Sequence, residues 1–210
     1  MHRSRTIMAE DLQKPASPSF EALLQEIRGC RLCAAHLPIG PRPVLQAAAD
    51  ARLLIVGQAP GRRVHESGVP FDDPSGERLR DWLGVDRDTF YNPNRIAIVP
   101  MGFCYPGTGS GGDLPPRPEC APTWHPRVLP LLGAVRLTLI IGQYAQAALL
   151  GDTRGTNLTA TVQDWRTHLE HDRLPLPHPS PRNNRWLKRN PWFAEELLPV
   201  LRQRVADALA

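Results

Sequence analysis

Residues 53 to 76 constrain the fold of this chain more than any other stretch. They begin with a short apolar run of branched side chains, Leu53 to Val56, which is typical of a buried strand in a parallel sheet. The run breaks at once into Gly57-Gln58-Ala59-Pro60-Gly61, a turn that exposes backbone amides. Because ligands of open α/β sheets bind at the carboxyl ends of the strands, we expect this turn to face a ligand.

Further apolar runs alternate with helical patterns along the chain. We expect strands at residues 53–56, 96–101, 137–141 and 174–177, with a weaker candidate at 158–162. We expect helices at residues 20–28, 77–83, 124–132, 142–150 and 190–208, the last with a kink or restart at Pro199. Residues 57–76 and 107–118 are expected to be loops. The alternation predicts an α/β fold, a three-layer α/β/α sandwich with a central, mostly parallel four-stranded sheet.

The length of 210 residues suits one ordinary domain, which we place at residues 20–210 after a flexible tail at 1–19. No apolar run approaches the roughly 20 residues that cross a bilayer, and the polar N-terminus lacks the apolar core of a secretory signal. We therefore expect a cytoplasmic monomer with no membrane partner. The net charge of +4 is modestly basic and gives only weak support for a nucleic-acid partner.

The chain has four cysteines, Cys30, Cys33, Cys104 and Cys120. The first two form a CxxC motif, and the other two lie 16 residues apart. Because cytosolic proteins rarely keep structural disulfides, this set indicates metal binding or redox chemistry, unless the four are unrelated buried thiols. Four thiolates suit either a structural zinc ion or a 4Fe–4S cluster, and the spacing alone does not choose between them.

Two short motifs follow the first and the last expected strand. They are Gly57-Gln58-Ala59-Pro60-Gly61 and His178-Pro179-Ser180-Pro181-Arg182-Asn183. Together they resemble the defining motifs of the uracil-DNA glycosylase superfamily, and most closely those of its iron–sulfur-containing family 4 branch. Gly68, Pro70, Phe71 and Gly76 also stand at the spacing of family 4, as do the four cysteines. The resemblance covers residues 30 to about 200, and it favours the 4Fe–4S cluster over zinc.

This resemblance implies a DNA repair enzyme that flips uracil out of DNA and hydrolyses its glycosidic bond, leaving an abasic site. Other deaminated bases are further candidate substrates. Phe71 matches the phenylalanine that stacks on the flipped base, and the amides around Gly57, Gln58 and Ala59 would bind the base edge. His178 matches the histidine that donates to the carbonyl oxygen on which charge develops. The alternatives are a non-catalytic module that binds uracil or abasic DNA and, more remotely, a hydrolase of free nucleosides or nucleotides.

The second motif also carries the expected DNA contacts. Arg182 stands where relatives insert a side chain into the duplex to fill the gap left by the flipped base. Residues 178–192 contain four cations and no acid, together with Trp186 and Trp192. Such a segment suits phosphates, although it is also compatible with a solvated loop and helix start. The residues expected to contact DNA are Pro60, Gly61, Ser180, Pro181, Arg182, Arg185 and Lys188.

The sequence departs from the family pattern at three places. Relatives carry a carboxylate or an asparagine at or next to the second position of the first motif, where it orients or activates water. This chain has Gln58 and Ala59 there. Val64 and His65 replace an acidic pair of family 4, and Pro100 replaces the asparagine that reads the uracil edge.

Nearby residues are candidates for the missing functions. Asp72, Asp73 and His65 are the candidate catalytic groups beside His178 and Gln58, although either aspartate is equally suited to cap the helix that follows. Asn183 is the candidate for reading the base edge.

Overall fold

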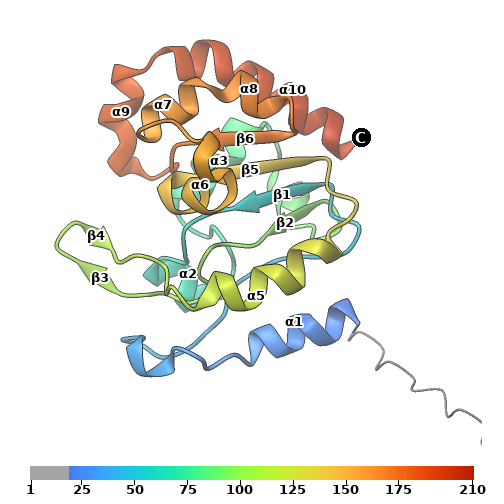
Figure 1. Cartoon of the computed structure of the whole chain (residues 1–210), viewed down its shortest axis with the longest axis vertical. Helices are drawn as coiled ribbons and strands as arrows, with labels where there is room; N and C mark the ends of the chain where they lie inside the picture. The colour runs from blue at the N-terminus through green and yellow to red at the C-terminus, as the bar shows by residue number, and fades with distance from the viewer. Residues whose placement is uncertain (1–18) are drawn as a thin grey trace, which may run out of the picture.

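A four-stranded parallel sheet forms the centre of the computed structural model, which describes residues 19–210 (Figure 1). The strands are β1 (Leu53–Val56), β2 (Ile96–Ile98), β5 (Leu137–Ile141) and β6 (Arg173–Leu176), in the order β2-β1-β5-β6. Leu53 lies opposite Ile96 on one side and opposite Leu137 on the other. Because all the pairings are parallel, the carboxyl ends of the four strands share one edge of the sheet.

One face of the sheet is covered by helices from the middle and the end of the chain. They are α3 (Pro74–Leu83), α4 (Arg87–Phe90), a short π-helix (Phe193–Leu197) and α10 (Leu198–Leu209). Successive side chains of a strand point to opposite faces, and Leu53 and Ile55 of β1 point to this one. The ring of Trp82 in α3 stands edge-on to Phe193, with 4.8 Å between the ring centroids.

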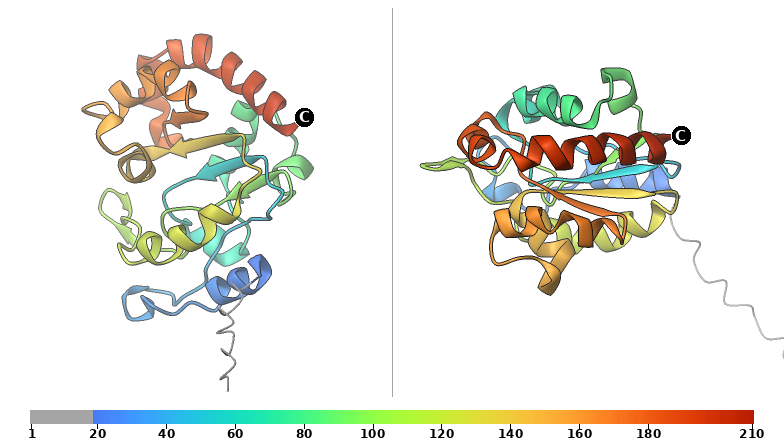
Figure 2. Two further views of the ribbon diagram at one scale, coloured as in Figure 1. Left: turned by 45° about the vertical axis from the view of Figure 1, so that its right-hand side comes forward. Right: turned by 90° about the horizontal axis from the view of Figure 1, so that it is seen from above.

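The other face is covered by α1 (Phe20–Arg28), α5 (Cys120–Val128) and α6 (Gly142–Leu150). Leu54 and Val56 of β1 point to this face and pack with buried side chains of the three helices. Two further helices, α7 (Leu158–Gln163) and α8 (Trp165–Leu169), pack along the edge strand β6. Viewed from above, helices lie on both sides of the sheet (Figure 2). The predicted three-layer α/β/α sandwich is therefore confirmed.

Several short elements lie near the carboxyl edge of the sheet. α2 (Arg62–Ser67) follows the first motif, and a 3-10 turn (Pro181–Asn183) leads from the second motif into α9 (Asn184–Arg189). Between them in sequence, β3 (Thr108–Gly109) and β4 (Gly112–Asp113) form an antiparallel hairpin. This hairpin projects from the body of the molecule in every view (Figures 1 and 2). The other 3-10 turns are Ala34–His36, Leu129–Leu131 and Gly151–Thr153.

The local predictions are confirmed where apolar runs or caps are strong. The strands at 53–56 and 137–141 and the helices at 20–28 and 142–150 have the expected bounds, and β6 is shifted by one residue. The strand proposed at 158–162 is wrong, because these residues form α7. The side chain of Asn157 accepts a hydrogen bond from the backbone N–H of Ala160 at 3.0 Å and so caps a helix.

Other boundaries also differ from the predictions. The loop expected at 57–76 contains α2, and the loop expected at 107–118 contains the hairpin. β2 ends at Ile98 rather than 101, although the N–H groups of Val99 and Met101 still donate to the carbonyl oxygens of Ile55 and Gly57. α3 and α5 begin earlier than expected, at Pro74 and Cys120, and α5 ends at Val128. The restart expected at Pro199 is confirmed, since α10 begins at Leu198 after the π-helix.

The tail predicted at 1–19 lies outside the described residues except for Ser19, which caps α1 by accepting a hydrogen bond from the N–H of Ala22. Within residues 19–210, none of the helices is long and apolar enough to cross a membrane.

Candidate active site

A cavity of about 210 Å³ opens at the carboxyl edge of the sheet. Its main walls are the loop after β1, the stretch from the end of α2 into α3, and the loop after β6. It gathers ten of the predicted site residues: Gly57, Gln58, Ala59, Pro60, Gly61, Phe71, Asp73, His178, Ser180 and Arg182. The lining residues that the sequence did not suggest for the site are Val44, Val64, Pro70, Ser75, Ile98, Pro100 and Asp113. The location agrees with the usual ligand position in open α/β sheets.

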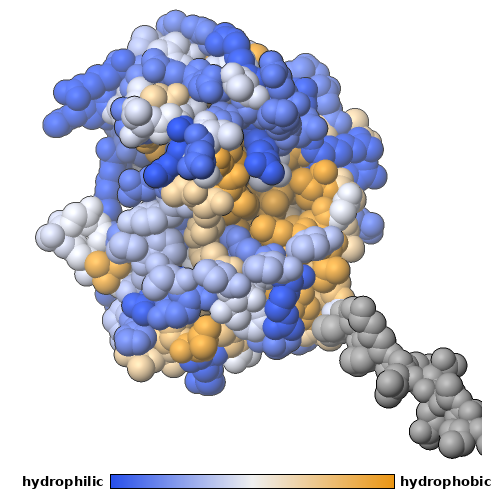
Figure 3. All heavy atoms as spheres, in the orientation of Figure 1, coloured by the Kyte–Doolittle hydropathy of each residue, from blue (hydrophilic) through white to orange (hydrophobic). Residues whose placement is uncertain are grey.

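A larger hollow of about 880 Å³ lies between α5, α6 and the proline-rich segment after β4. Its surroundings include apolar surface, drawn in orange in Figure 3. None of the described side chains that line it is a carboxylate or a cysteine. The smaller cavity, with two carboxylates and a histidine, is therefore the better candidate for chemistry.

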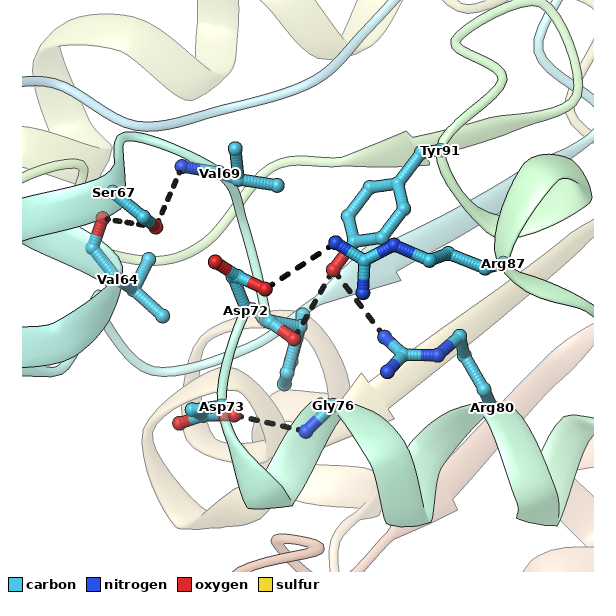
Figure 4. A network of polar contacts seen from close by, with 10 residues as sticks. Val64, Ser67, Val69, Asp72, Asp73, Gly76, Arg80, Arg87 and Tyr91 are labelled. Carbon is cyan, nitrogen blue, oxygen red and sulfur yellow. Dashed lines mark hydrogen bonds and ion pairs between the residues drawn. The ribbon is translucent and has the colours of Figure 1, made fainter.

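Phe71 is held in an unusual backbone conformation on the cavity wall. Its φ of +54° lies in the left-handed region, which residues other than glycine rarely adopt. The hydroxyl of Tyr91 donates to the carbonyl oxygen of Phe71 at 3.2 Å, and Arg80 in turn donates to that hydroxyl at 3.3 Å (Figure 4). A Cβ at Gly76 would stand 1.7 Å from the same carbonyl, so only glycine fits there. The tip of the Phe71 ring lies 3.5 Å from where a Cβ of Gly57 would be.

His178 is held by its own loop in one tautomer. The backbone N–H of Ser180 donates to Nδ1 of His178 at 3.2 Å, so the proton of the neutral ring is on Nε2. Burial lowers the pKa of His178 below its ordinary value, while nearby Asp73 and Asp113 oppose this shift and Arg182 adds to it. The ring is therefore neutral at pH 7 and has an N–H to donate.

Two side chains brace the backbone of this loop. The side-chain amide of Asn183 donates to the carbonyl oxygen of His178 at 2.7 Å. The guanidinium of Arg78, in α3, donates to the carbonyl oxygen of Ser180 at 3.2 Å. Asn183 and Pro181 are not among the residues that line the cavity, so the structure does not bring Asn183 to the base edge as the sequence suggested.

The aspartates next to Phe71 have different surroundings. Asp73 lines the cavity, and its Oδ1 accepts the N–H of Gly76 at 2.9 Å as the N-cap of α3 (Figure 4). Asp72 is not part of the cavity wall and forms an ion pair with Arg87 at 3.4 Å. The capping role is thus filled by Asp73, and the structure does not place Asp72 at the site.

His65 is also kept from the cavity. It is buried in α2, and its ring lies 6.3 Å from that of Tyr105, while its neighbour Val64 lines the cavity instead. Burial lowers the pKa of His65, and nearby Arg42 adds to the shift. The structure therefore does not support His65 as a catalytic group.

Asp113 is the charged residue among the lining residues that the sequence did not suggest. It lies in β4 of the hairpin, within a stretch expected to be loop, and its side chain reaches the cavity. Its Oδ2 lies 3.4 Å from where a Cβ of Gly61 would be, at the end of the first motif. The only signal in the sequence was an acid within a run of glycines, which does not reveal how the hairpin folds back.

Pro100 stands on the cavity wall, where an asparagine was expected from the resemblance. Its carbonyl oxygen is already bonded to Nε2 of the buried His125 at 3.0 Å. Pro100 therefore presents an apolar ring to the cavity. Ser75, which is buried in the first turn of α3, adds a hydroxyl to the same wall.

The basic segment after the second motif contains both exposed and partly buried side chains. Arg182, Arg185 and Lys188 are exposed, as expected for phosphate contacts. The indole N–H of Trp186 instead donates to the hydroxyl of Thr159 at 2.8 Å, and the ring packs against Phe193. Trp186 thus contributes to packing within the protein.

The four cysteines line one small pocket although they come from three segments of the chain. They form no disulfide, and the N–H of Phe103 donates to Sγ of Cys120 at 3.3 Å. Burial raises the pKa of the Cys104 thiol to about 11 and that of Cys120 to about 12. No three histidine, cysteine or acidic side chains within residues 19–210 are arranged to hold a single metal ion.

The family model for the uracil DNA glycosylase superfamily matches residues 45–202. The chain belongs to this superfamily. The matched range contains both motif loops and every residue of the cavity wall except Val44. Membership in the uracil DNA glycosylase superfamily supports a glycosylase-like function acting on DNA. Cys30 and Cys33 precede the matched range, so the match does not bear on the cysteine cluster.

Proposed function

We propose that the protein is a monofunctional DNA glycosylase of the family 4 type that excises uracil, and related deaminated bases, to leave an abasic site. The observation that carries this proposal is the convergence of Phe71, the first motif and Nε2–H of His178 on one cavity. An aromatic platform, backbone donors and a neutral histidine are the parts that base excision requires.

The flipped base would stack on Phe71. Extruding a nucleotide from the duplex costs a few kcal/mol, and stacking in a shaped pocket recovers part of this cost. The left-handed backbone of Phe71, its bond from Tyr91 and the lack of a side chain at Gly76 fix the ring before the base arrives. The amides around Gln58 would then bind the polar edge of the base.

His178 would stabilise the leaving base. Breaking the bond between C1′ and N1 places negative charge on a carbonyl oxygen of uracil, and a fixed neutral donor stabilises that charge without a proton transfer. The bond from Ser180 to Nδ1 directs the only ring proton to Nε2. Asn183 and Arg78 are positioning residues because they bind the carbonyl oxygens of His178 and Ser180 and so hold the backbone of this loop.

Asp73 would stabilise the sugar as it becomes positively charged. Its carboxylate lies on the cavity wall and is kept in place by its hydrogen bond to the N–H of Gly76. Gln58 would orient the attacking water, since an amide binds water but does not take its proton. This leaves the acceptor of that proton to be supplied by another residue.

The exposed cations Arg182, Arg185 and Lys188 would contact the DNA backbone. Phosphate contacts of this kind supply affinity and register rather than sequence preference, and they weaken with salt. Arg182 lies beside the cavity and, by analogy with relatives, would enter the space left by the flipped base.

The four cysteines would hold a 4Fe–4S cluster, with structural zinc as the alternative. Two features support this: all four line one pocket, and a backbone N–H is directed at Sγ of Cys120. When bound, the cluster would join the segment before β1 to the segment around α5. Its role would be structural, since the pocket is separate from the cavity that contains His178.

A strand-scission assay tests the proposal. A labelled oligonucleotide with one uracil is incubated with stoichiometric protein, and abasic sites are then cleaved with alkali. We expect scission at uracil and none in the matched thymine oligonucleotide. Binding to the uracil strand without scission would instead favour the non-catalytic module, an alternative that the neutral residues Gln58 and Ala59 keep open.

A further inference from the structure

The β3–β4 hairpin is docked on the first motif. The side-chain amide of Gln58 approaches the carbonyl oxygen of Leu114, directly after β4, at 3.5 Å. One residue earlier, Oδ2 of Asp113 lies 3.4 Å from where a Cβ of Gly61 would be. The hairpin thus contacts the motif near both of its ends and places a carboxylate beside it.

The carboxylate of Asp113 lies next to the first motif, which has no carboxylate of its own. The second and third residues of the first motif, Gln58 and Ala59, are neutral, so the motif itself has no group to accept a proton from water. We propose that Asp113 is the catalytic base, a carboxylate supplied by the hairpin in place of one in the motif. This inference rests on the proposed glycosylase function.

The other acids near the motif are less suited to the task. Asp72 is paired with Arg87, and Glu66 is paired with Arg62 at 2.9 Å and lies outside the cavity wall. One oxygen of Asp73 is occupied by the N–H of Gly76.

Asp113 has no ion-pair partner within residues 19–210. Its one hydrogen bond from a described side chain is long, 3.4 Å from the hydroxyl of Thr108. Its side chain is exposed at the cavity mouth, so water reaches it. Asp113 is therefore the carboxylate of the site that is free to bind and deprotonate a water molecule.

The bond between C1′ and N1 breaks, and its electron pair leaves with the base, which His178 stabilises as an anion. The oxygen of water forms a new bond to C1′, and Asp113 takes one proton from that water. Asp113 then releases that proton to solvent, the base anion takes up a proton from solvent, and the products are free uracil and an abasic site.

Single-turnover kinetics test this role. We expect Asp113→Asn to slow uracil release by about 100-fold or more, the usual range for loss of a general base. Affinity for the uracil oligonucleotide should be unchanged or higher, because a negative charge near the DNA is removed. Asp152→Asn is the matched control, since Asp152 is exposed in the Gly151–Thr153 turn and forms no ion pair within the described residues.

A second variant separates catalysis from structure. Asp113→Ala leaves space beside Gly61, and added formate should restore part of its rate, whereas formate should not affect a variant that has lost only hairpin packing. If the wild type is active and Asp113→Asn is equally active, Asp113 is not the catalytic base, and the glycosylase function still stands. Loss of activity in Asp113→Ala without formate rescue, with an equal loss of DNA binding or thermal stability, would overturn it too. Absence of uracil release by the wild type would overturn the glycosylase function itself.

Discussion

The backbone N–H of Ser180 donates to Nδ1 of His178 at 3.2 Å, and this single bond decides which ring nitrogen keeps the proton. The residue that donates the bond belongs to the same motif as the histidine, so the motif sets both the position and the tautomer of the ring. The resulting Nε2–H belongs to a residue that lines the cavity, which also contains Phe71. The proposed stabilisation of the leaving base depends on this donor.

Replacing His178 with alanine should therefore slow uracil release strongly. Removal of one preorganised donor to a developing oxyanion costs about 100- to 1,000-fold in rate, and we expect a loss in that range. Single-turnover release of the base is the measurement. His171→Ala is the control, because His171 is exposed and is not part of the cavity wall. A loss of rate shared by both variants would point to unfolding rather than to a lost donor.

The activity should depend on pH through the same ring. The donor role needs the neutral ring, because a protonated ring has no lone pair on Nδ1 to accept the N–H of Ser180. Burial lowers the pKa of His178, so the neutral form should persist below the ordinary histidine value and be lost as pH falls through the lowered pKa. Asp73 and Asp113 face the ring as acids and Arg182 as a cation.

The Arg182→Gln variant tests the sign of this dependence. Loss of the neighbouring cation should raise the pKa of His178, so the ring should gain its proton at a higher pH than in the wild type. NMR titration of the labelled histidine ring measures this directly. A His178 pKa above the ordinary value in the wild type would contradict the neutral-donor account.

Gly112 should be intolerant of a side chain. Its φ of +123° suits glycine, and a Cβ there would stand 1.8 Å from Nη1 of Arg182. Gly112→Ala should strain the hairpin and displace the Arg182 guanidinium, lowering both excision and DNA affinity. Gly111→Ala is the matched control, since a Cβ at Gly111 meets nothing within 4 Å. If the two variants had equal excision rates and equal DNA affinities, the hairpin would have no role in DNA binding or excision.

The cysteine cluster makes a separate prediction. Protein purified without oxygen should be brown and contain iron and sulfide, and Cys120→Ser should lose this colour and melt at a lower temperature. Metal analysis and visible absorption are the measurements. A colourless wild type that contains one zinc ion per chain would replace the cluster with structural zinc.

The sheet and the two motif loops could be predicted because their signals are local. Leu53–Val56 and Leu137–Ile141 are unbroken apolar runs, as buried parallel strands require. The strand wrongly expected at 158–162 is rich in threonine, which favours strands, but the cap from Asn157 outweighs that preference. In this segment the composition favours a strand, whereas the hydrogen bond from the N–H of Ala160 to Asn157 favours a helix.

The site was only partly predictable because several of its features depend on tertiary contacts. Asp113 reaches the cavity because a hairpin of two-residue strands folds back on Gly61, and glycine-rich strands this short leave no alternating pattern. Asp72 and Asp73 are equivalent in the sequence, and only the folded chain pairs Asp72 with Arg87 and turns Asp73 to the cavity. Likewise, the packing of Trp186 on Phe193 could not be read from its basic neighbours.

The most direct test of the central claim is the amount of free uracil released from a uracil-containing oligonucleotide by excess protein, measured by mass spectrometry. We expect one uracil per oligonucleotide with the wild type and a strongly slowed release with His178→Ala, while both proteins bind the DNA. Release of no uracil by folded wild-type protein that binds the oligonucleotide would contradict the proposed base excision.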